Sequence, residues 1–154
     1  MSDSSTLDSI IKSPIRVVQT PTAPVVVVGL PRSGSSYMTH VLSCLEGWFV
    51  FDDLYPYQKS KEFGISSTTD VTQQPETLKA FIHSLTWQLR AKIKFEENFQ
   101  VPDLTWNDTF EMEDCLLKTF AQGPVTWMTV LEEWLMRLAL HAGQSRWGYK
   151  TPQD

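Results

Sequence analysis

Apolar residues gather in three short runs that are typical of β-strands. Residues 25–28 are consecutive valines between a proline and a glycine, which is the pattern of a strand buried on both faces of a parallel sheet. Residues 48–51 are aromatic and β-branched, which predicts a second strand. Residues 146–149 look like the start of a third strand, and Pro152 limits how far its hydrogen-bond ladder continues.

Between these runs, apolar residues recur at the spacing of helices that bury one face. One such segment covers residues 35–45, a second begins at Pro75, and a third covers residues 127–138 and ends before a glycine. A further helix is expected near residues 111–121 after an irregular stretch, and the polar residues 58–74 are expected to form a loop. Strands and helices in this order predict an α/β fold with a parallel sheet.

The two ends of the chain differ from its middle. Residues 1–23 are rich in Ser, Thr, Asp and Pro, and the apolar pair Ile10 and Ile11 is too small to found a core. We therefore expect a flexible leader over residues 1–23 and a folded domain over residues 24–154. The chain stops two residues after Pro152, which would leave the sheet unfinished, so we expect a fragment of a larger domain.

The loop after the first predicted strand carries the clearest chemical signal. Its two glycines have the GxxxxG spacing of a phosphate-binding loop, between a predicted strand and a predicted helix. Glycines let the backbone fold closely around an anion, and the following helix adds the positive end of its dipole. We expect a phosphate site formed by these residues: Gly29, Leu30, Pro31, Arg32, Ser33, Gly34, Ser35 and Ser36.

The basic residue of this loop distinguishes it from the loop of nucleotide triphosphatases. Their loop continues from the second glycine with Lys and then Ser or Thr, whereas here Ser35 follows Gly34 and Arg32 lies inside the loop. An internal Arg suits a single phosphate and its bridging oxygen better than a triphosphate with magnesium. The alternative is a surface turn in which Ser35 or Ser36 is the N-cap of the helix.

Two segments resemble elements of the P-loop sulfotransferase family, whose sulfuryl donor is 3'-phosphoadenylyl sulfate (PAPS). Residues 26–36 resemble its donor-binding loop, in which hydrophobic residues precede Gly, two variable positions, Arg or Lys, Ser-Gly, and two Ser or Thr. Residues 147–152 resemble a strand and Lys-Thr-Pro element of many bacterial and carbohydrate-directed members. The chain departs from many relatives at Tyr149, where they carry an acidic residue.

The resemblance implies a sulfotransferase that moves a sulfuryl group from PAPS to an acceptor hydroxyl or amine, without a metal. The implied fold is part of a P-loop three-layer domain whose carboxyl-terminal portion, including the family's site for the 3'-phosphate, is missing. Arg32 would contact the donor's 5'-phosphate and stabilise the leaving oxygen. The other donor-binding residues would be Pro31, Ser33, Gly34, Ser35 and Ser36. The acceptor would be a small molecule or a carbohydrate.

The transfer also needs a base for the acceptor hydroxyl. Asp52 and Asp53 follow the second predicted strand, near where some families carry a catalytic Glu, and the spacing to Gly34 slightly favours Asp53. Tyr149 is the second choice. Two adjacent Asp residues are also typical of a turn or a helix cap. These two residues would lie near the loop only if the first and second predicted strands are neighbours in the sheet.

Composition narrows the classes of partner. A formal net charge of −5 disfavours a broad nucleic-acid surface. The apolar run at residues 25–30 is far shorter than the roughly 20 residues that cross a bilayer, and the amino terminus lacks a signal-peptide pattern. We therefore expect a cytoplasmic protein. Cys44 and Cys115 suggest neither a zinc site nor a disulfide framework.

Two other functions stay open. One is a degenerate P-loop nucleotide kinase or NTPase, which needs a relocated lysine and an acidic strand end, neither of which is evident in the sequence. The other is a non-catalytic nucleotide-binding fragment, because the family's 3'-phosphate site follows the Lys-Thr-Pro element. Hydrolysis of ATP would favour the first function, and donor binding without turnover would favour the second.

Overall fold

The computed structural model describes residues 10–18, 23–30, 32–96, 99–101 and 103–152. In this part of the chain, one parallel sheet has the strand order β1-β3-β2, with β1 at Val25–Gly29, β2 at Trp48–Phe51 and β3 at Arg146–Pro152. The prediction of a mixed α/β fold with a parallel sheet is therefore confirmed.

β3 is the central strand, and a glycine lets β1 approach it closely. Val25 pairs with Gly148, and a Cβ atom at Gly148 would lie 2.5 Å from the carbonyl oxygen of Val25. A larger residue would therefore force the two strands apart. In the same register Val27 pairs with Lys150, so Lys150 lies beside the carboxyl end of β1.

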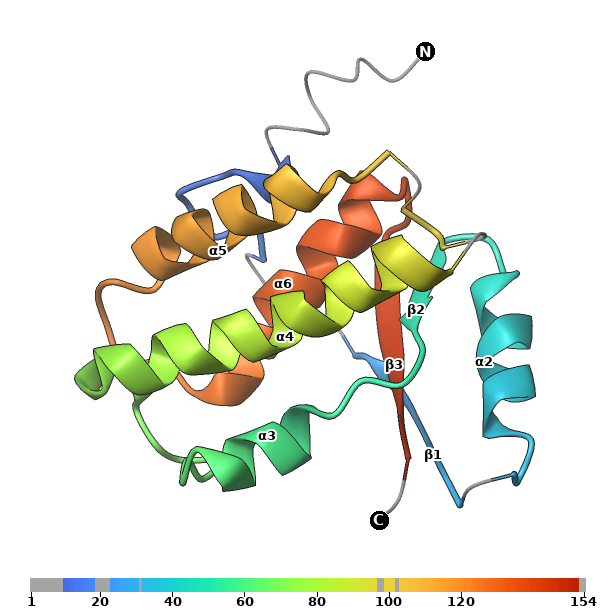
Figure 1. Ribbon diagram of the computed structural model, residues 1–154, viewed down its shortest axis with the longest axis horizontal. Coiled ribbons are helices and arrows are strands. Elements are labelled where there is room, and N and C mark those ends of the chain that lie inside the picture. Colours follow the sequence, from blue (N-terminus) through green and yellow to red (C-terminus); the bar gives the residue numbers. More distant parts are fainter. Residues whose placement is uncertain (1–9, 19–22, 31, 97–98, 102, 153–154) are drawn as a thin grey trace.

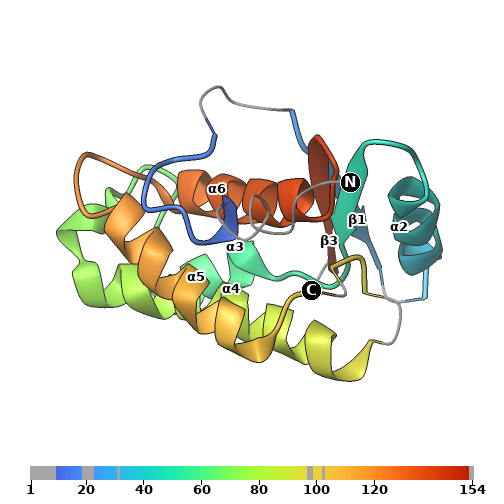
Figure 2. The ribbon, with the colours of Figure 1, turned by 90° about the horizontal axis from the view of Figure 1, so that it is seen from above.

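Helices cover both faces of the sheet. α2 (Ser35–Ser43) lies on one face, while α6 (Trp127–His141), α4 (Pro75–Phe95) and α5 (Trp106–Thr119) lie on the other side (Figure 1 and Figure 2). In the described chain the sheet therefore lies between α2 on one side and several helices on the other, and a short loop joins the carboxyl end of β1 to α2.

The hydrophobic core extends from one face of the sheet through α6 to α4 and α5. Alternate residues of β2 and β3 are buried on this side: Phe49, Phe51, Trp147 and Tyr149. The ring centroid of Phe51 lies 5.3 Å from that of Trp134 in α6. Lys150 points to the opposite face, where its ammonium group reaches the hydroxyl of Ser36 in α2. The alternation of β3 therefore separates an apolar face from one that carries a buried charge.

β1 differs from the prediction that it is buried on both faces. It is an edge strand of the described sheet, and Val26 and Val28 are 43% and 55% exposed. Much of the apolar face that predicted α2 is exposed too: Met38, Val41 and Leu45. The valine run predicted the strand correctly. It could not predict the burial, because burial depends on which strands and helices become neighbours.

Two helices differ from the sequence analysis. α3 (Pro56–Glu62) occupies the start of a stretch predicted as a loop, and Pro56 lies in its first turn, where a missing N–H is tolerated. The same stretch also contains a 3-10 turn, η1 (Val71–Gln73). α5 begins earlier than predicted because Thr105 and Asp108 form a capping box. None of the helices in the described chain has the length and apolar composition of a membrane span.

Residues 10–18 pack into the fold, in contrast to the flexible leader expected over residues 1–23. Ile11 is buried, and three backbone carbonyl groups of this segment accept hydrogen bonds from the guanidinium of Arg137. Glu133 accepts hydrogen bonds from two backbone N–H groups of the segment and pairs with Arg137. Buried charges need such polar partners, and composition alone does not show that this segment supplies them.

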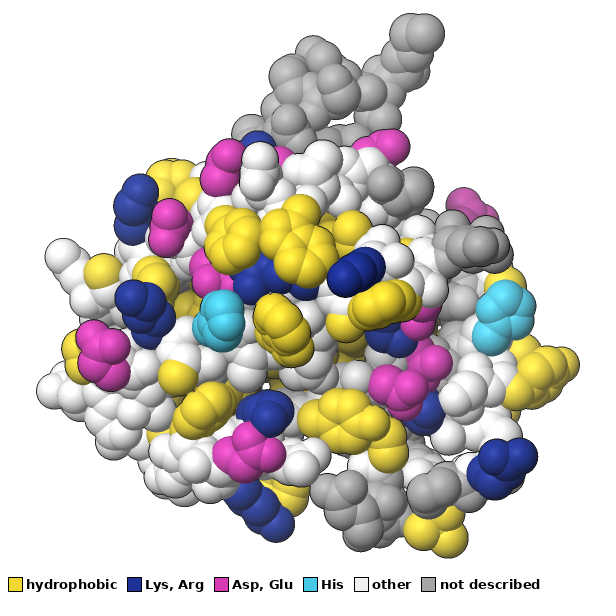
Figure 3. Space-filling view, viewed as in Figure 1, with side chains coloured by type: hydrophobic (Ala, Val, Ile, Leu, Met, Phe, Trp, Pro, Cys, Tyr) yellow, Lys and Arg dark blue, Asp and Glu magenta, His cyan; other side chains and the backbone are white. Residues whose placement is uncertain are grey.

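A second buried polar cluster joins α4 to α5. Arg90 donates hydrogen bonds to Thr109 and Glu113, and its guanidinium carbon lies 3.8 Å from the ring centroid of Phe110. Hydrophobic side chains gather on the surface over these two helices (Figure 3). Phe110 is one of the exposed aromatic residues, so its ring shields the Arg90 guanidinium from water.

Candidate functional site

The predicted phosphate loop connects β1 to α2, as the sequence analysis expected. The N–H of Ser33 donates to the carbonyl of Leu30 over 3.1 Å, which closes a turn. Gly34 has a φ of 85°, which favours glycine, and Arg32 has a φ of 62°, which is uncommon for a residue with a side chain. Such strained positions cluster at functional sites. Pro31, predicted to bind the donor, lies outside the described residues.

Gly29 is required by a close approach within the loop. A Cβ atom at this position would lie 2.6 Å from Oγ of Ser33 and 2.9 Å from Cβ of Ser35. The loop therefore folds back onto the end of β1 and leaves no room for a larger residue. The sequence pattern predicted that the glycines let the backbone fold around an anion, whereas the close approach at Gly29 is to the side chains of Ser33 and Ser35.

The amino end of α2 has no side-chain cap. Gly34 is its N-cap residue and has no side chain that could accept a hydrogen bond from the first turn. Thr105 caps α5 and Thr126 caps α6 through their hydroxyl groups, whereas α3 and α4 also lack a side-chain cap. The first N–H groups of a helix have no partner within the helix, so α2 offers them to an anion, together with the positive end of its dipole.

A cavity of about 430 Å³ opens at this helix end. Its lining comes from the loop, the turn after β2 and the end of β3: Gly29, Leu30, Arg32, Gly34, Ser35, Ser36, Asp53, Tyr55, Lys150 and Pro152. The carboxyl ends of parallel strands are the usual place for ligand sites in α/β sheets. Seven of the residues selected from the sequence line this one cavity, six from the loop together with Asp53, but Ser33 does not.

Arg32 and Lys150 bring positive charge to this cavity by different means. Arg32 is exposed, and none of the described carboxylates forms an ion pair with it. Lys150 is 6% exposed and donates hydrogen bonds to Oγ of Ser36 over 2.9 Å and to Oδ1 of Asp53 over 2.6 Å. Arg32 is therefore an exposed cation that a ligand can reach, whereas Lys150 is a buried cation held in place by Ser36 and Asp53.

The charge of Lys150 is stabilised by the acidic pair. Burial by itself lowers the pKa of Lys150, but the hydrogen bond to Asp53 and the negative charges of Asp52 and Asp53 outweigh it. The pKa is raised above its ordinary value, so the ammonium is protonated at neutral pH. Lys150 belongs to the Lys-Thr-Pro element, but the sequence pattern does not indicate this role for it. The available signal was a lysine directly after the predicted strand residues Trp147, Gly148 and Tyr149.

Asp53 reaches the cavity although β2 and β1 are not neighbours. β3 lies between them, and the backbone N–H of Leu54 donates to the carbonyl of Lys150 over 2.9 Å. This hydrogen bond holds the turn after β2 against β3. Asp53 has a φ of 55°, a second strained position. The expected requirement that the two strands be neighbours is therefore wrong, because Lys150 connects the acidic turn to the loop.

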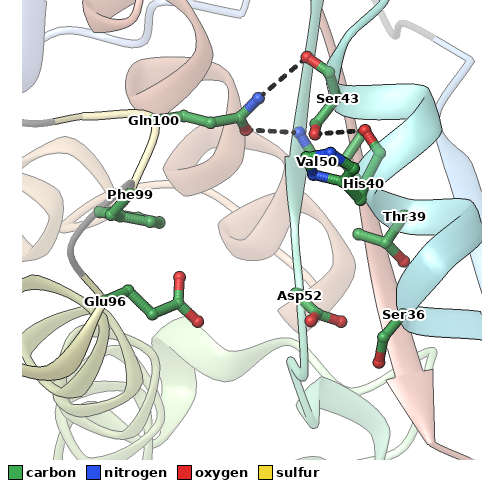
Figure 4. Close-up of a pocket in the computed structure, with 9 residues that line it drawn as sticks. All are labelled: Ser36, Thr39, His40, Ser43, Val50, Asp52, Glu96, Phe99 and Gln100. Atoms are coloured by element: carbon green, nitrogen blue, oxygen red, sulfur yellow. Dashed lines mark hydrogen bonds between the residues drawn. The ribbon is translucent and has the colours of Figure 1, made fainter.

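Asp52 borders a second cavity, of about 150 Å³. Figure 4 shows Ser36 and His40 of α2 on one side of this cavity and Glu96 on the other. Oδ1 of Asp52 lies 3.3 Å from Nζ of Lys150, in an orientation that makes an ion pair but no hydrogen bond. The two predicted bases thus face different cavities, and Lys150 pairs with both.

Tyr149, the second choice for the base, lies on the wrong face of β3. Its side chain belongs to the hydrophobic core on the α6 side, and burial raises the pKa of its phenol. A buried phenol that ionises less readily than usual cannot serve as a base at the loop. Asp53 is therefore the candidate base that lines the cavity.

Comparisons with protein families, with curated proteins and with solved structures find no match for this chain. The chemistry of the site is therefore argued from its geometry. It combines an uncapped helix end, two cations and a carboxylate around one cavity, which suits an anionic ligand and a proton transfer beside it.

Proposed function

We propose that this chain is part of a sulfotransferase that binds PAPS at the loop between β1 and α2. The observation that carries the proposal is the convergence of Arg32, Ser36, Lys150 and Asp53 on one cavity at the carboxyl end of the sheet. The P-loop assignment rests on this site together with the resemblance of residues 26–36 and 147–152 to the sulfotransferase family.

The proposed phosphate site uses the loop backbone and two cations. The uncapped N–H groups of α2 and the hydroxyls of Ser35 and Ser36 would hold the donor's 5'-phosphate. Arg32 is free of carboxylate partners in the described chain, so it would pair with the same phosphate. Its charge and that of Lys150 would stabilise the oxygen that leaves with the phosphate.

The proposed reaction needs one proton transfer. PAPS supplies a sulfuryl group joined to its 5'-phosphate through a bridging oxygen. The acceptor hydroxyl forms a bond to sulfur, the bond from sulfur to the bridging oxygen breaks, and that oxygen keeps the electron pair. Asp53 would accept the proton of the acceptor hydroxyl. Lys150, which pairs with Asp53 in this structure, would shift toward the leaving oxygen and release the carboxylate for this role.

A second candidate, a nucleotide kinase or NTPase, is favoured by Lys150 itself. That function needs a relocated lysine and an acidic strand end, and the structure brings Lys150 of β3 to Ser36 and places Asp52 and Asp53 after β2. However, both carboxylates pair with Lys150, which leaves them less suited to hold magnesium than free carboxylates. We therefore rank this candidate below sulfuryl transfer.

Nucleotide binding separates the two candidates. Calorimetric titration of the chain with 3'-phosphoadenosine 5'-phosphate (PAP), and separately with ATP and Mg²⁺, should show saturable binding of PAP and weaker binding of ATP that Mg²⁺ does not strengthen. Tighter binding of ATP with Mg²⁺, or release of phosphate from it, would support the kinase or NTPase and overturn the proposal. Binding of PAP without turnover of PAPS would identify a non-catalytic fragment.

A further inference from the structure

Two cavities continue from the candidate site along α3. The first, of about 280 Å³, shares Tyr55 and Pro152 with the loop cavity. The second, of about 460 Å³, shares Tyr57 and Lys61 with the first. In Figure 1 and Figure 2, α3 lies on the side of the sheet away from α2. We call these two adjoining cavities the α3 groove.

The charge of the α3 groove is positive in an otherwise acidic protein. Among the described residues that line it, Lys61 is the only charged one, and no carboxylate lines either cavity. The neighbouring Lys59 is neutralised by Glu62 at 2.7 Å. Lys61 forms no ion pair with a described carboxylate, and its Nζ lies 4.4 Å from the ring centroid of Tyr57. This cation–π contact holds the ammonium at the junction of the two cavities.

The remaining lining of the groove suits a ring that carries hydroxyl groups. Tyr55, Tyr57 and Trp127 contribute aromatic surface, and Tyr57 is 58% exposed. Thr151 contributes a hydroxyl group to the first cavity and Ser66 contributes one to the second. Pockets with aromatic walls and a few polar groups bind flat organic molecules and fix their orientation.

From this lining we infer that the α3 groove binds the acceptor, and that the acceptor is a hydroxyl-bearing ring compound with a negative charge. The inference rests on the proposed function. The ring would lie along Tyr57 and the negative charge would pair with Lys61. Because the groove meets the loop cavity at Tyr55, two residues after Asp53, this arrangement brings the acceptor hydroxyl toward the proposed base.

A matched pair of probes tests the charge preference. We would titrate the chain with 4-hydroxyphenylacetate and with its neutral amide, 4-hydroxyphenylacetamide, and follow binding by NMR. The acid should bind the parent roughly three- to fivefold more tightly than the amide, the size expected of an exposed ion pair. Lys61→Ala should abolish this difference. Lys61→Arg and Lys59→Ala should preserve it, because each leaves a cation at the junction.

Equal binding of acid and amide to the parent, or an unchanged preference in Lys61→Ala, would overturn the inference. PAP titrations of the same proteins keep it separate from the proposed function. If PAP binds normally and the probes show no charge preference, the assignment of the groove fails alone. If the preference is present and PAP does not bind, the proposed function fails, and the groove loses its role as an acceptor site.

Discussion

Lys150 of β3 donates a hydrogen bond to Asp53, in the turn after β2, over 2.6 Å between Nζ and Oδ1. The same ammonium donates to Ser36 at the start of α2. One buried side chain thus joins the central strand, the acidic turn and the phosphate loop. The geometry of the candidate site depends on this lysine, although the loop motif does not contain it.

Replacing Lys150 should weaken nucleotide binding. Lys150→Met removes a charged hydrogen-bond donor, whose loss costs about 1.5–3 kcal/mol, so affinity for PAP should fall roughly tenfold or more.

The charge of Lys150 should also persist over a wide pH range. Since the pKa of Lys150 is raised above 10.5, its charge stabilises the fold fully below that pH, and this contribution is lost only as the pH rises through the folded-state pKa. The parent's affinity should therefore show no titration of this group between about pH 7 and pH 9.

Calorimetry of the parent, of Lys150→Met and of Lys79→Met checks this expectation. Lys79 is an exposed lysine of α4 and serves as the control for loss of one positive charge. Unchanged affinity in Lys150→Met would exclude Lys150 from the phosphate site. An equal loss of affinity for PAP in Lys150→Met and Lys79→Met would show that the effect comes from net charge and not from the position of Lys150.

Asp53 and Asp52 should differ in their effect on turnover, because Asp53 lines the loop cavity and Asp52 borders the other one. With PAPS and an acceptor that supports turnover, Asp53→Asn should lower kcat roughly a hundredfold or more while affinity for PAP stays nearly constant. Asp52→Asn should have a smaller effect. Rates measured over a series of PAPS concentrations provide the comparison. The role of Asp53 is disproved if its Asn variant keeps most of the parent rate.

The elements with strong local signals could be predicted from the sequence. β2, α4 and α6 have apolar spacing and boundary residues that agree with each other, and the structure contains them. α3 was missed because its polar residues show no helical period, although Pro56 in its first turn was a signal. The predicted start of α5, near residue 111, lies after the observed start at Trp106, because that start depends on a cap formed by Thr105 and Asp108.

The site could be predicted only where it is local in sequence. The loop from Gly29 to Ser36 is one continuous segment, so its glycines, arginine and serines could be selected together. The contact of Lys150 with Asp53 joins residues that are 97 positions apart. It depends on the strand order, in which β3 lies between β1 and β2. Local patterns do not encode that order.

The buried pair of Arg137 and Glu133 should be important for stability. Both side chains are fully buried, and they hold residues 10–18 against α6. Arg137→Met removes the cation that lies 3.1 Å from Glu133 and leaves Arg16, at 4.0 Å, as its ion-pair partner. The free energy of unfolding should therefore fall by about 3 kcal/mol, the lower end of the range for a broken buried pair. Urea denaturation measures this change. Arg146→Met is the control at an exposed arginine whose guanidinium lies 5.6 Å from the ring centroid of Trp48, and it should change stability by about 1 kcal/mol or less.

Limited proteolysis reports on the same segment. Trypsin should cleave after Arg16 faster in Arg137→Met than in the parent, because the segment loses the guanidinium that binds its carbonyl groups. A variant with parental stability and parental resistance at Arg16 would show that residues 10–18 do not depend on the buried pair.

Asp70 should make stability depend on pH in the acid range. Hydrogen bonds from the hydroxyl of Thr72 and from the N–H of Val125 lower the pKa of Asp70 to about 2, from an ordinary value of 3.8. Because the pKa is lower in the folded chain, the carboxylate stabilises the fold above pH 3.8, and this contribution is lost as the pH falls toward 2.

Asp70→Asn should therefore be less stable than the parent near neutral pH, and the difference should shrink as the pH is lowered from about 4 to about 2. Urea denaturation at a series of pH values measures it, with Asp103→Asn as the control at an exposed carboxylate. If the free energies of unfolding of Asp70→Asn and the parent differ by a constant amount over this pH range, protonation of Asp70 is not coupled to folding as predicted.

The central claim, that the loop between β1 and α2 holds the donor's 5'-phosphate through Arg32, is tested most directly by calorimetric titration of the parent and of Arg32→Ala with PAP. Arg146→Ala is the control for loss of an exposed arginine outside the cavity. We expect saturable binding with one site in the parent and in Arg146→Ala, and affinity that is roughly tenfold or more lower in Arg32→Ala. Equal affinities in the parent and Arg32→Ala, or no binding of PAP to the parent, would contradict the claim.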